Sequence, residues 1–203
     1  MDNKNTFPPL FTAAEDWENN ACIPDGTADS ILYIEGYRRA AEYLVAEVQA
    51  SARNQDFLVY PIIFLYRHYL ELILKSIISD SQELLDEPKK PRISHCLQDL
   101  WPEAKGLLRK IHSFKTCKET QHLDHVIAEF AKLDPTGETF RYPFTLEGET
   151  LLSGLKHINL RHLADQLKKV SDLLDGVSMG VSAALDTKYE VARYYCEEMC
   201  DGE

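Results

Sequence analysis

The sequence predicts an all-α protein: an up-and-down helical bundle of about five to six helices, with a long aromatic loop before the last long helix. Three observations support this fold class. Apolar residues recur at helical spacing along most of the chain, strand-forming runs are scarce, and the linkers between periodic segments are short. With 203 residues and 44% hydrophobic content, the chain is long enough to bury a substantial core.

The pattern divides the chain into an extended N-terminal arm, residues 1–26, and a single helical-bundle domain, residues 27–203. The arm contains three prolines and little periodicity, so we expect no regular helix there. The first helix of the bundle should begin at Asp29 or Ser30, because either side chain can cap it. Its apolar spacing continues to about Arg53.

The next three helices are expected near residues 56–80, 94–114 and 119–133. Pro61 lies in the opening turns of the first of these, where a proline is tolerated. Pro102 should break or restart the second, because the residue before a proline disfavours the helical conformation. The third shows apolar residues on one face and ends at a turn.

The last third of the chain contains an aromatic loop and then the clearest helical pattern. The loop, from Thr139 to Gly148, should be extended or contain a short β excursion. A heptad-like seam follows, with alternating steps of three and four residues: Leu160, Leu163, Leu167, Val170, Leu174, Val177 and Val181. It can pack into its own bundle or against a partner chain, and we favour the former. Gly176 and Gly180 predict a bend near its end.

Charge and hydropathy narrow the classes of partner. The net charge is −11, from 22 basic and 33 acidic residues, which gives RNA or nucleotide binding no support beyond a local patch. The densest basic cluster, Lys89, Lys90 and Arg92, reads as a solvated loop. Arg67 and His68 interrupt the longest apolar run, and the N-terminus lacks the layout of a secretory signal. We therefore expect a cytoplasmic protein without a membrane segment.

Cysteine and histidine spacing predicts no metal site and no cofactor. Five cysteines, an odd number without a CxxC pair, indicate reduced thiols. Cys196 and Cys200 are four residues apart, and His122 and His125 are three apart. A metal site can be imagined from these pairs, but neither has the spacing of a known zinc motif.

Charged residues cross the most apolar helix of the chain. Arg67, Glu71 and Lys75 are spaced by four residues, so Glu71 can pair with either basic side chain. A helix that is apolar on most sides is usually buried, and buried charges persist only when they are paired. This stripe, with His68 beside it, therefore either locks a core or lines a site.

Three phrases carry a resemblance to a known superfamily. FLYRHYLELILK at 64–75, HCLQDLW at 95–101 and DPTGETFRYPF at 134–144 resemble prokaryotic helical proteins of the HEPN superfamily, over roughly residues 57–175. The resemblance implies a homodimeric bundle from toxin, antiphage defence or RNA-cleaving systems. It further implies an Arg and a His, with four to six residues between them, that cut RNA without metal. No arginine of this chain is followed by a histidine at that spacing.

A divergent ribonuclease site can still be assembled from candidate residues. His68 and Glu71 could act as base and acid, while Arg67 and Arg141 could stabilise the phosphate. The structural alternative is that Arg67 and Glu71 belong to an ion-pair ladder and that His68 only satisfies a backbone carbonyl. We favour the structural alternative.

The loop and the end of the stripe supply candidate binding residues: Lys75, Tyr142 and Asp134. Arg141, flanked by aromatic residues, can present its guanidinium to a phosphate or carboxylate. It can equally dock the loop by pairing with Glu71 or Asp134, which we favour slightly. If Arg141 reaches the stripe, loop and helix would form one polar centre.

Two functions from different classes follow. The first is a binding or regulatory module, dimeric or joined to a protein partner, that serves as an accessory part of a defence or toxin–antitoxin system. The second is a divergent metal-independent ribonuclease or nucleotide-processing enzyme. Net charge and the missing Arg–His spacing favour the first. A small-molecule sensor is a third alternative, since bundles readily enclose apolar pockets.

Overall fold

The structure is a computed structural model that describes residues 9–23, 30–88, 94–111 and 117–200. Within these ranges the regular secondary structure is helical, without named strands, which confirms the predicted all-α bundle. A short 3-10 turn, Trp17–Asn19, precedes five α-helices: α1 (Ser30–Ser51), α2 (Gln55–Leu84), α3 (Leu97–Lys110), α4 (Lys118–Leu133) and α5 (Leu160–Cys200).

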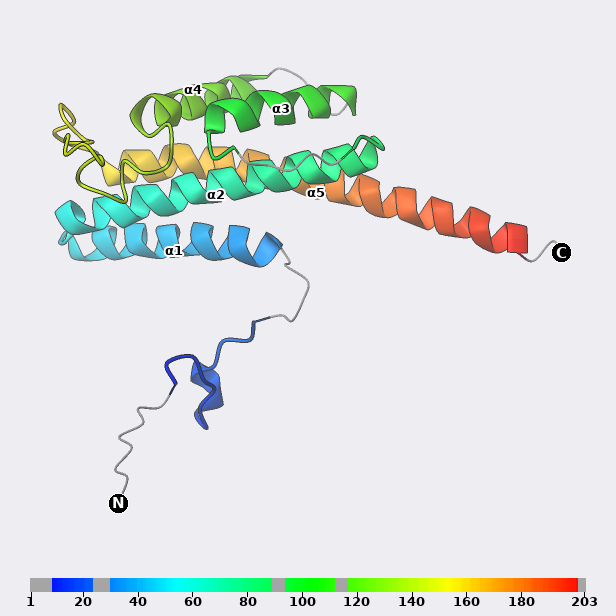
Figure 1. Cartoon of the computed structure of the whole chain (residues 1–203), viewed down its shortest axis with the longest axis horizontal. Coiled ribbons are helices and arrows are strands. Elements are labelled where there is room, and N and C mark those ends of the chain that lie inside the picture. Colours follow the sequence, from blue (N-terminus) through cyan, green and yellow to red (C-terminus); the bar gives the residue numbers. More distant parts are fainter. Residues whose placement is uncertain (1–8, 24–29, 89–93, 112–116, 201–203) are drawn as a thin grey trace.

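The helix α2 is the centre of the bundle. It packs against α1, α3 and α5, and Figure 1 shows α3 and α4 lying together over α2 and α5. Buried residues occur on nearly every side of α2, including Ile62, Tyr69, Leu74 and Ile78. Burial of this apolar surface supplies most of the stabilisation of the fold.

The length and composition of α2 also meet the criterion for a membrane span. Half of its most apolar window is buried inside the bundle, however. Core helices of soluble proteins share these properties, so the feature is weak evidence of membrane association.

The predicted break at Pro102 is wrong, because α3 runs without interruption from Leu97 to Lys110. The neighbouring Trp101 is buried, and its Nε1 donates a hydrogen bond to Asp124 Oδ1 at 2.6 Å. A proline near the start of a helix removes one backbone hydrogen bond, and this tertiary anchor offsets the loss. Ser94 lies before the helix, where its hydroxyl accepts the backbone N–H of Cys96 at 3.1 Å.

Gly176 and Gly180 do not interrupt α5, which is one helix of 41 residues, and the bend expected there stays a prediction. Leu174 and Val181, which flank the two glycines, are buried in the common core. Each glycine costs a helix about 1 kcal/mol relative to alanine, and this packing compensates. The seam from Leu160 to Val181 packs into its own bundle, as we favoured.

The remaining boundaries lie close to those expected. The first helix begins at Ser30, while Asp29 lies outside the described residues. It ends at Ser51, and Ala52 and Asn54 adopt positive φ angles in the turn to α2. Residues 134–159 form the long loop, with one isolated bridge between Phe144 and Thr150.

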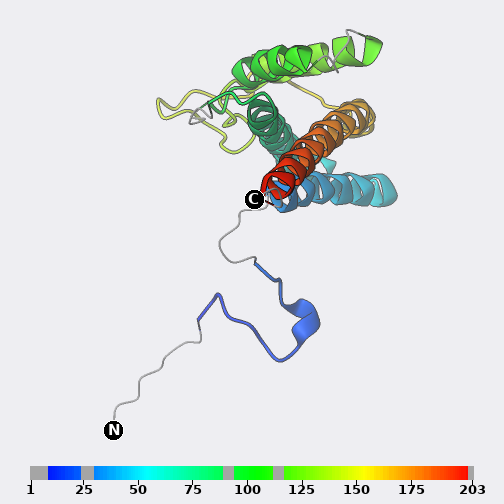
Figure 2. The same ribbon diagram turned by 90° about the vertical axis from the view of Figure 1, so that its right-hand side faces the viewer.

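The described part of the N-terminal arm, residues 9–23, lies away from the bundle in both views (Figures 1 and 2). Its 3-10 turn is held by the Asn20 side chain, which exchanges hydrogen bonds of 2.9 and 2.7 Å with the backbone of Ala14. The division of the chain after residue 26 stays a prediction. The basic cluster Lys89, Lys90 and Arg92 lies outside the described residues.

Candidate functional site

Glu71 is the centre of a polar network buried at the contact between α2 and the loop before α3. Its carboxylate accepts hydrogen bonds from Arg67 Nη1 at 3.0 Å and from Lys75 Nζ at 2.7 Å. The Nδ1 atom of His95 lies 2.7 Å from the same carboxylate. Only 5% of the Glu71 side chain is exposed. We call Arg67, Glu71, Lys75, His95 and Asp134 the Glu71 network.

Arg67 ties three segments of the chain together. Its Nη2 donates to the backbone carbonyl of His95 at 2.6 Å, and its Nε donates to the carbonyl of Asp134 at 3.3 Å. The Nε atom also lies 3.4 Å from Asp134 Oδ2, which is an ion-pair contact rather than a hydrogen bond. The other carboxylate oxygen, Asp134 Oδ1, accepts the backbone N–H of Thr139 at 3.0 Å. The guanidinium therefore holds both loops against α2.

The DPTGET segment closes over this guanidinium through Gly137. This glycine has φ +84°, in the left-handed region, and a Cβ there would stand 2.7 Å from Arg67 Nη1. Any other residue would have to displace Arg67 as well as adopt a strained backbone. The glycine thus serves a close approach of loop to helix, and Arg67 is enclosed rather than presented to a substrate.

The surroundings of Glu71 keep it ionised. Burial raises the pKa of Glu71, but hydrogen bonds from Lys75 and His95 and the charge of Lys75 outweigh that effect, so the pKa lies below its ordinary value. A carboxylate with a lowered pKa and three partners is poorly suited to donate a proton near neutral pH. The structural role that we favoured for Arg67 and Glu71 agrees with this geometry.

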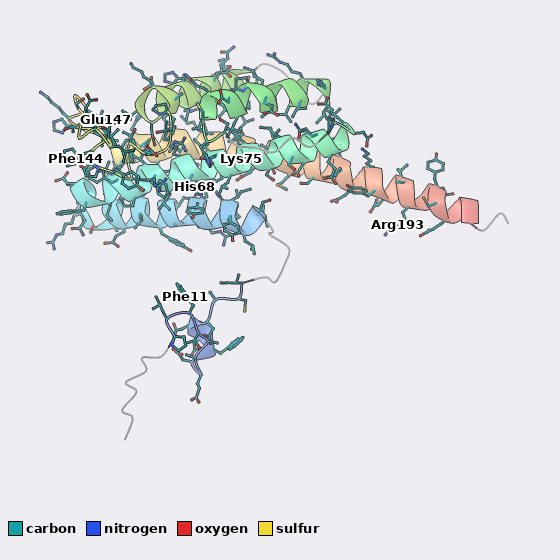
Figure 3. The ribbon with its side chains drawn as sticks, viewed as in Figure 1. Phe11, His68, Lys75, Phe144, Glu147 and Arg193 are labelled. Atoms are coloured by element: carbon teal, nitrogen blue, oxygen red, sulfur yellow. The ribbon has the colours of Figure 1, made fainter. Side chains whose placement is uncertain are left out.

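His68 lies on another side of α2. Its ring packs edge-to-face on Tyr37 of α1, with centroids 4.3 Å apart, and stacks on Phe64 at 5.8 Å. Figure 3 labels His68 and Lys75 along α2; His68 contacts Tyr37 of α1, whereas Lys75 Nζ contacts Glu71. Among the described residues, His68 therefore contacts aromatic side chains, and no hydrogen bond or ion pair joins it to Glu71.

The pKa of His68 predicts a pH-dependent contribution to stability. Burial lowers it, with the charge of Arg67 adding to the effect and that of Glu71 opposing it. The unfolded chain therefore binds a proton more readily, and stability should fall as pH drops below the ordinary histidine value of about 6.5. We expect the melting temperature to fall less between pH 7 and pH 5 in His68→Phe than in wild type. Equal slopes in thermal denaturation would contradict this role.

Arg141 and Tyr142 are exposed and do not join the Glu71 network. The Arg141 guanidinium lies 5.7 Å from the Phe64 ring and 5.1 Å from the Tyr142 ring, and its Nη2 donates to the Tyr142 hydroxyl at 3.1 Å. Among the ion pairs of the described residues, none joins Arg141 to Glu71 or Asp134, so the expected docking pair does not form. Instead, Arg141 and His68 both contact the ring of Phe64.

His95 is the member of the network that sequence reasoning missed. Its side chain is 68% exposed although Nδ1 contacts the buried Glu71, so the ring presents its far edge to solvent. A carboxylate that orients an exposed imidazole is an arrangement used in acid–base sites and around metals. No local pattern could reveal it, because the two residues are 24 positions apart and meet only through the packing of α2 against the start of α3.

Comparisons with known proteins do not place the chain in a family. No family model matches it, and neither curated proteins nor solved structures show significant similarity. The resemblance to the HEPN superfamily thus stays a prediction, and functional inference rests on the geometry of the described residues.

Proposed function

We propose that this chain is a binding or regulatory module that acts as a homodimer. The observation that carries the proposal is the C-terminal part of α5, which extends beyond the other helices in Figure 1. A role as an accessory part of a prokaryotic defence or toxin–antitoxin system rests on the HEPN-like phrases alone. The enclosure of Arg67 and Glu71 in a structural network favours binding over catalysis.

Contacts with α2 fix the direction of the projecting part of α5, and the surface of this part is partly apolar. Lys188 Nζ donates to the carbonyls of Glu83 and Leu84 at 2.9 and 3.1 Å, and the Tyr189 hydroxyl contacts the Glu83 side chain. These contacts hold α5 against the end of α2 and set the direction in which it leaves the bundle. Beyond them, three apolar or aromatic side chains are about half exposed: Val191 at 49%, Tyr194 at 58% and Tyr195 at 60%.

The spacing and charge of this segment suit pairing with a second copy. Val191, Tyr194 and Tyr195 occupy positions i, i+3 and i+4, which form one stripe on a helix. Exposed Glu190 and Arg193 flank the stripe with opposite charges. In an antiparallel pair of such helices, Arg193 of one copy can meet Glu190 of the other while the stripes pack together.

The test is the mass of the protein in solution. We expect the double variant Tyr194→Asp, Tyr195→Asp to be monomeric at 23.2 kDa, because charges in the stripe oppose its burial. The control is Tyr43→Asp on α1, a more exposed tyrosine away from the stripe, which should remain dimeric. Light scattering after gel filtration gives the masses. Dimers of unchanged stability in the double variant would refute the proposed interface.

A divergent metal-independent ribonuclease is the second candidate, favoured by the pairing of His95 with Glu71. An oriented, solvent-facing imidazole could accept the proton of a 2′-hydroxyl, with Lys75 close by to offset negative charge. RNA cleavage in the presence of chelator by wild type, lost in folded His95→Ala and retained in His68→Phe, would support this function. If the wild-type protein does not cleave RNA, the binding module remains the proposed function.

A further inference from the structure

The imidazole of His95 is held in one tautomer by the buried carboxylate of Glu71. Burial raises the pKa of Glu71, but the hydrogen bonds from Lys75 and His95 outweigh that effect and keep the carboxylate ionised. An ionised carboxylate only accepts hydrogen bonds, so the Nδ1 atom of His95, 2.7 Å away, carries a proton. In a neutral imidazole the lone pair then lies on Nε2. Because 68% of the side chain is exposed, this lone pair is accessible to a molecule in solution.

The other exposed histidines lack this arrangement. His125, His157 and His162 are also exposed, but within the described residues His95 is the only histidine in ion-pair contact with a carboxylate. A carboxylate on one ring nitrogen orients the imidazole and stabilises the positive charge that develops when the other nitrogen forms a bond. His95 therefore has the chemistry of an activated nucleophile, and the other three histidines provide a comparison within the same molecule.

The surroundings of His95 favour an electrophile that carries negative charge. Lys75 Nζ lies 2.7 Å from the same carboxylate oxygen that contacts His95, and its side chain is 21% exposed. The helix α3 begins at Leu97, two residues after His95, and its N-cap residue Cys96 makes no side-chain capping hydrogen bond. A helix N-terminus attracts anions, although Asp99 in the first turn offsets part of this effect. A phosphoryl group carries the negative charge that these features favour, whereas an acyl group does not.

We propose that His95 is a phosphoryl-accepting residue, whose Nε2 atom takes a phosphoryl group from an N-phosphorylated donor of the phosphoramidate class. The Nε2 lone pair forms a bond to phosphorus while the P–N bond of the donor breaks, and the electron pair of that bond leaves on the donor nitrogen. The proton on Nδ1 stays in place, so the ring becomes a phosphorylated imidazolium whose positive charge faces the Glu71 carboxylate. Glu71 is thus a positioning residue. The step requires neither the projecting part of α5 nor RNA cleavage, and it goes beyond the proposed function.

The experiment treats the full chain at neutral pH with potassium phosphoramidate. Mass spectrometry of peptides kept under alkaline conditions, in which phosphohistidine is stable, follows the phosphorylation of each histidine. We expect His95 to be phosphorylated at least about ten-fold faster than His125, His157 or His162, because these lack an orienting carboxylate. Phosphorus NMR should identify the product as the Nε2 isomer. The four histidines are compared in one unmodified protein, so this measurement does not depend on the folding of a variant.

Two variants test the part that Glu71 plays. Glu71→Gln keeps the size of the side chain and removes its charge, so the rate at His95 should fall at least about ten-fold while the rate at His125 stays unchanged. Circular dichroism shows whether this variant is folded. The control His125→Ala should leave the rate at His95 unchanged. The proposal would be overturned by the absence of a phosphoryl group on His95, by equal rates at His95 and the other exposed histidines, or by an unchanged rate at His95 in folded Glu71→Gln.

Discussion

Replacing Glu71 with alanine should lower the free energy of unfolding by about 3–5 kcal/mol, the range typical when one partner of a buried ion pair is removed. Glu71 is the only carboxylate that contacts Arg67, Lys75 and His95 together within the described residues. Its loss would leave the Arg67 guanidinium, of which only 3% is exposed, with Asp134 as its remaining acidic neighbour. Urea denaturation followed by circular dichroism measures the change.

The matched control for this variant is Glu42→Ala on α1. Glu42 pairs with Arg38 four residues away, but 46% of its side chain is exposed. Such a surface pair contributes about 0.5 kcal/mol or less. If Glu71→Ala also cost less than about 0.5 kcal/mol, the buried network would not stabilise the fold, and the structural interpretation of the stripe would be wrong.

Because the pKa of Glu71 is lowered, the contribution of the Glu71 network to the free energy of unfolding should depend on pH. Because the folded state binds a proton on Glu71 less readily than the unfolded state, the network's contribution is present above the ordinary glutamate value and is lost as pH falls through the folded-state pKa. The stability difference between wild type and Glu71→Ala should therefore shrink under acidic conditions.

Leu167→Asp should prevent folding altogether at room temperature. Leu167 is 1% exposed and belongs to the seam of α5 that packs into the common core. Burying a carboxylate there without a partner costs several kcal/mol, and the lost leucine contacts add about 2–5 kcal/mol more. Together these terms are comparable to the whole stability of a domain, about 5–15 kcal/mol. The variant should show no cooperative thermal transition.

Lys169→Asp is the control, because it places the same side chain two residues away on the exposed face of α5. It should melt within a few degrees of wild type. A normally folded Leu167→Asp of unchanged mass would contradict the assignment of the seam to the core.

The fold could be predicted because it depends on periodicity, which is local. The seam from Leu160 to Val181 and the apolar faces of the earlier helices already identify the buried side of each element. The predicted break at Pro102 failed because intrinsic propensity amounts to about 1–3 kcal/mol, and tertiary contacts such as Trp101 with Asp124 outweigh it.

The candidate site was harder to predict because it depends on contacts between distant segments. Spacing alone indicated that Glu71 pairs with Arg67 and Lys75, and both pairs form. Spacing could not show that His68 faces Tyr37, nor that His95 completes the network. Spacing related His122 to His125, but it could not show that His157 and His162 line the same groove between α4 and α5.

The mass of the wild-type protein across a micromolar concentration series, measured by light scattering after gel filtration, tests the central claim most directly. Association through the projecting part of α5 predicts twice the chain mass of 23.2 kDa, with dissociation on dilution. A mass of 23.2 kDa at every concentration would contradict the account, because the stripe formed by Val191, Tyr194 and Tyr195 would then have no second copy to bind.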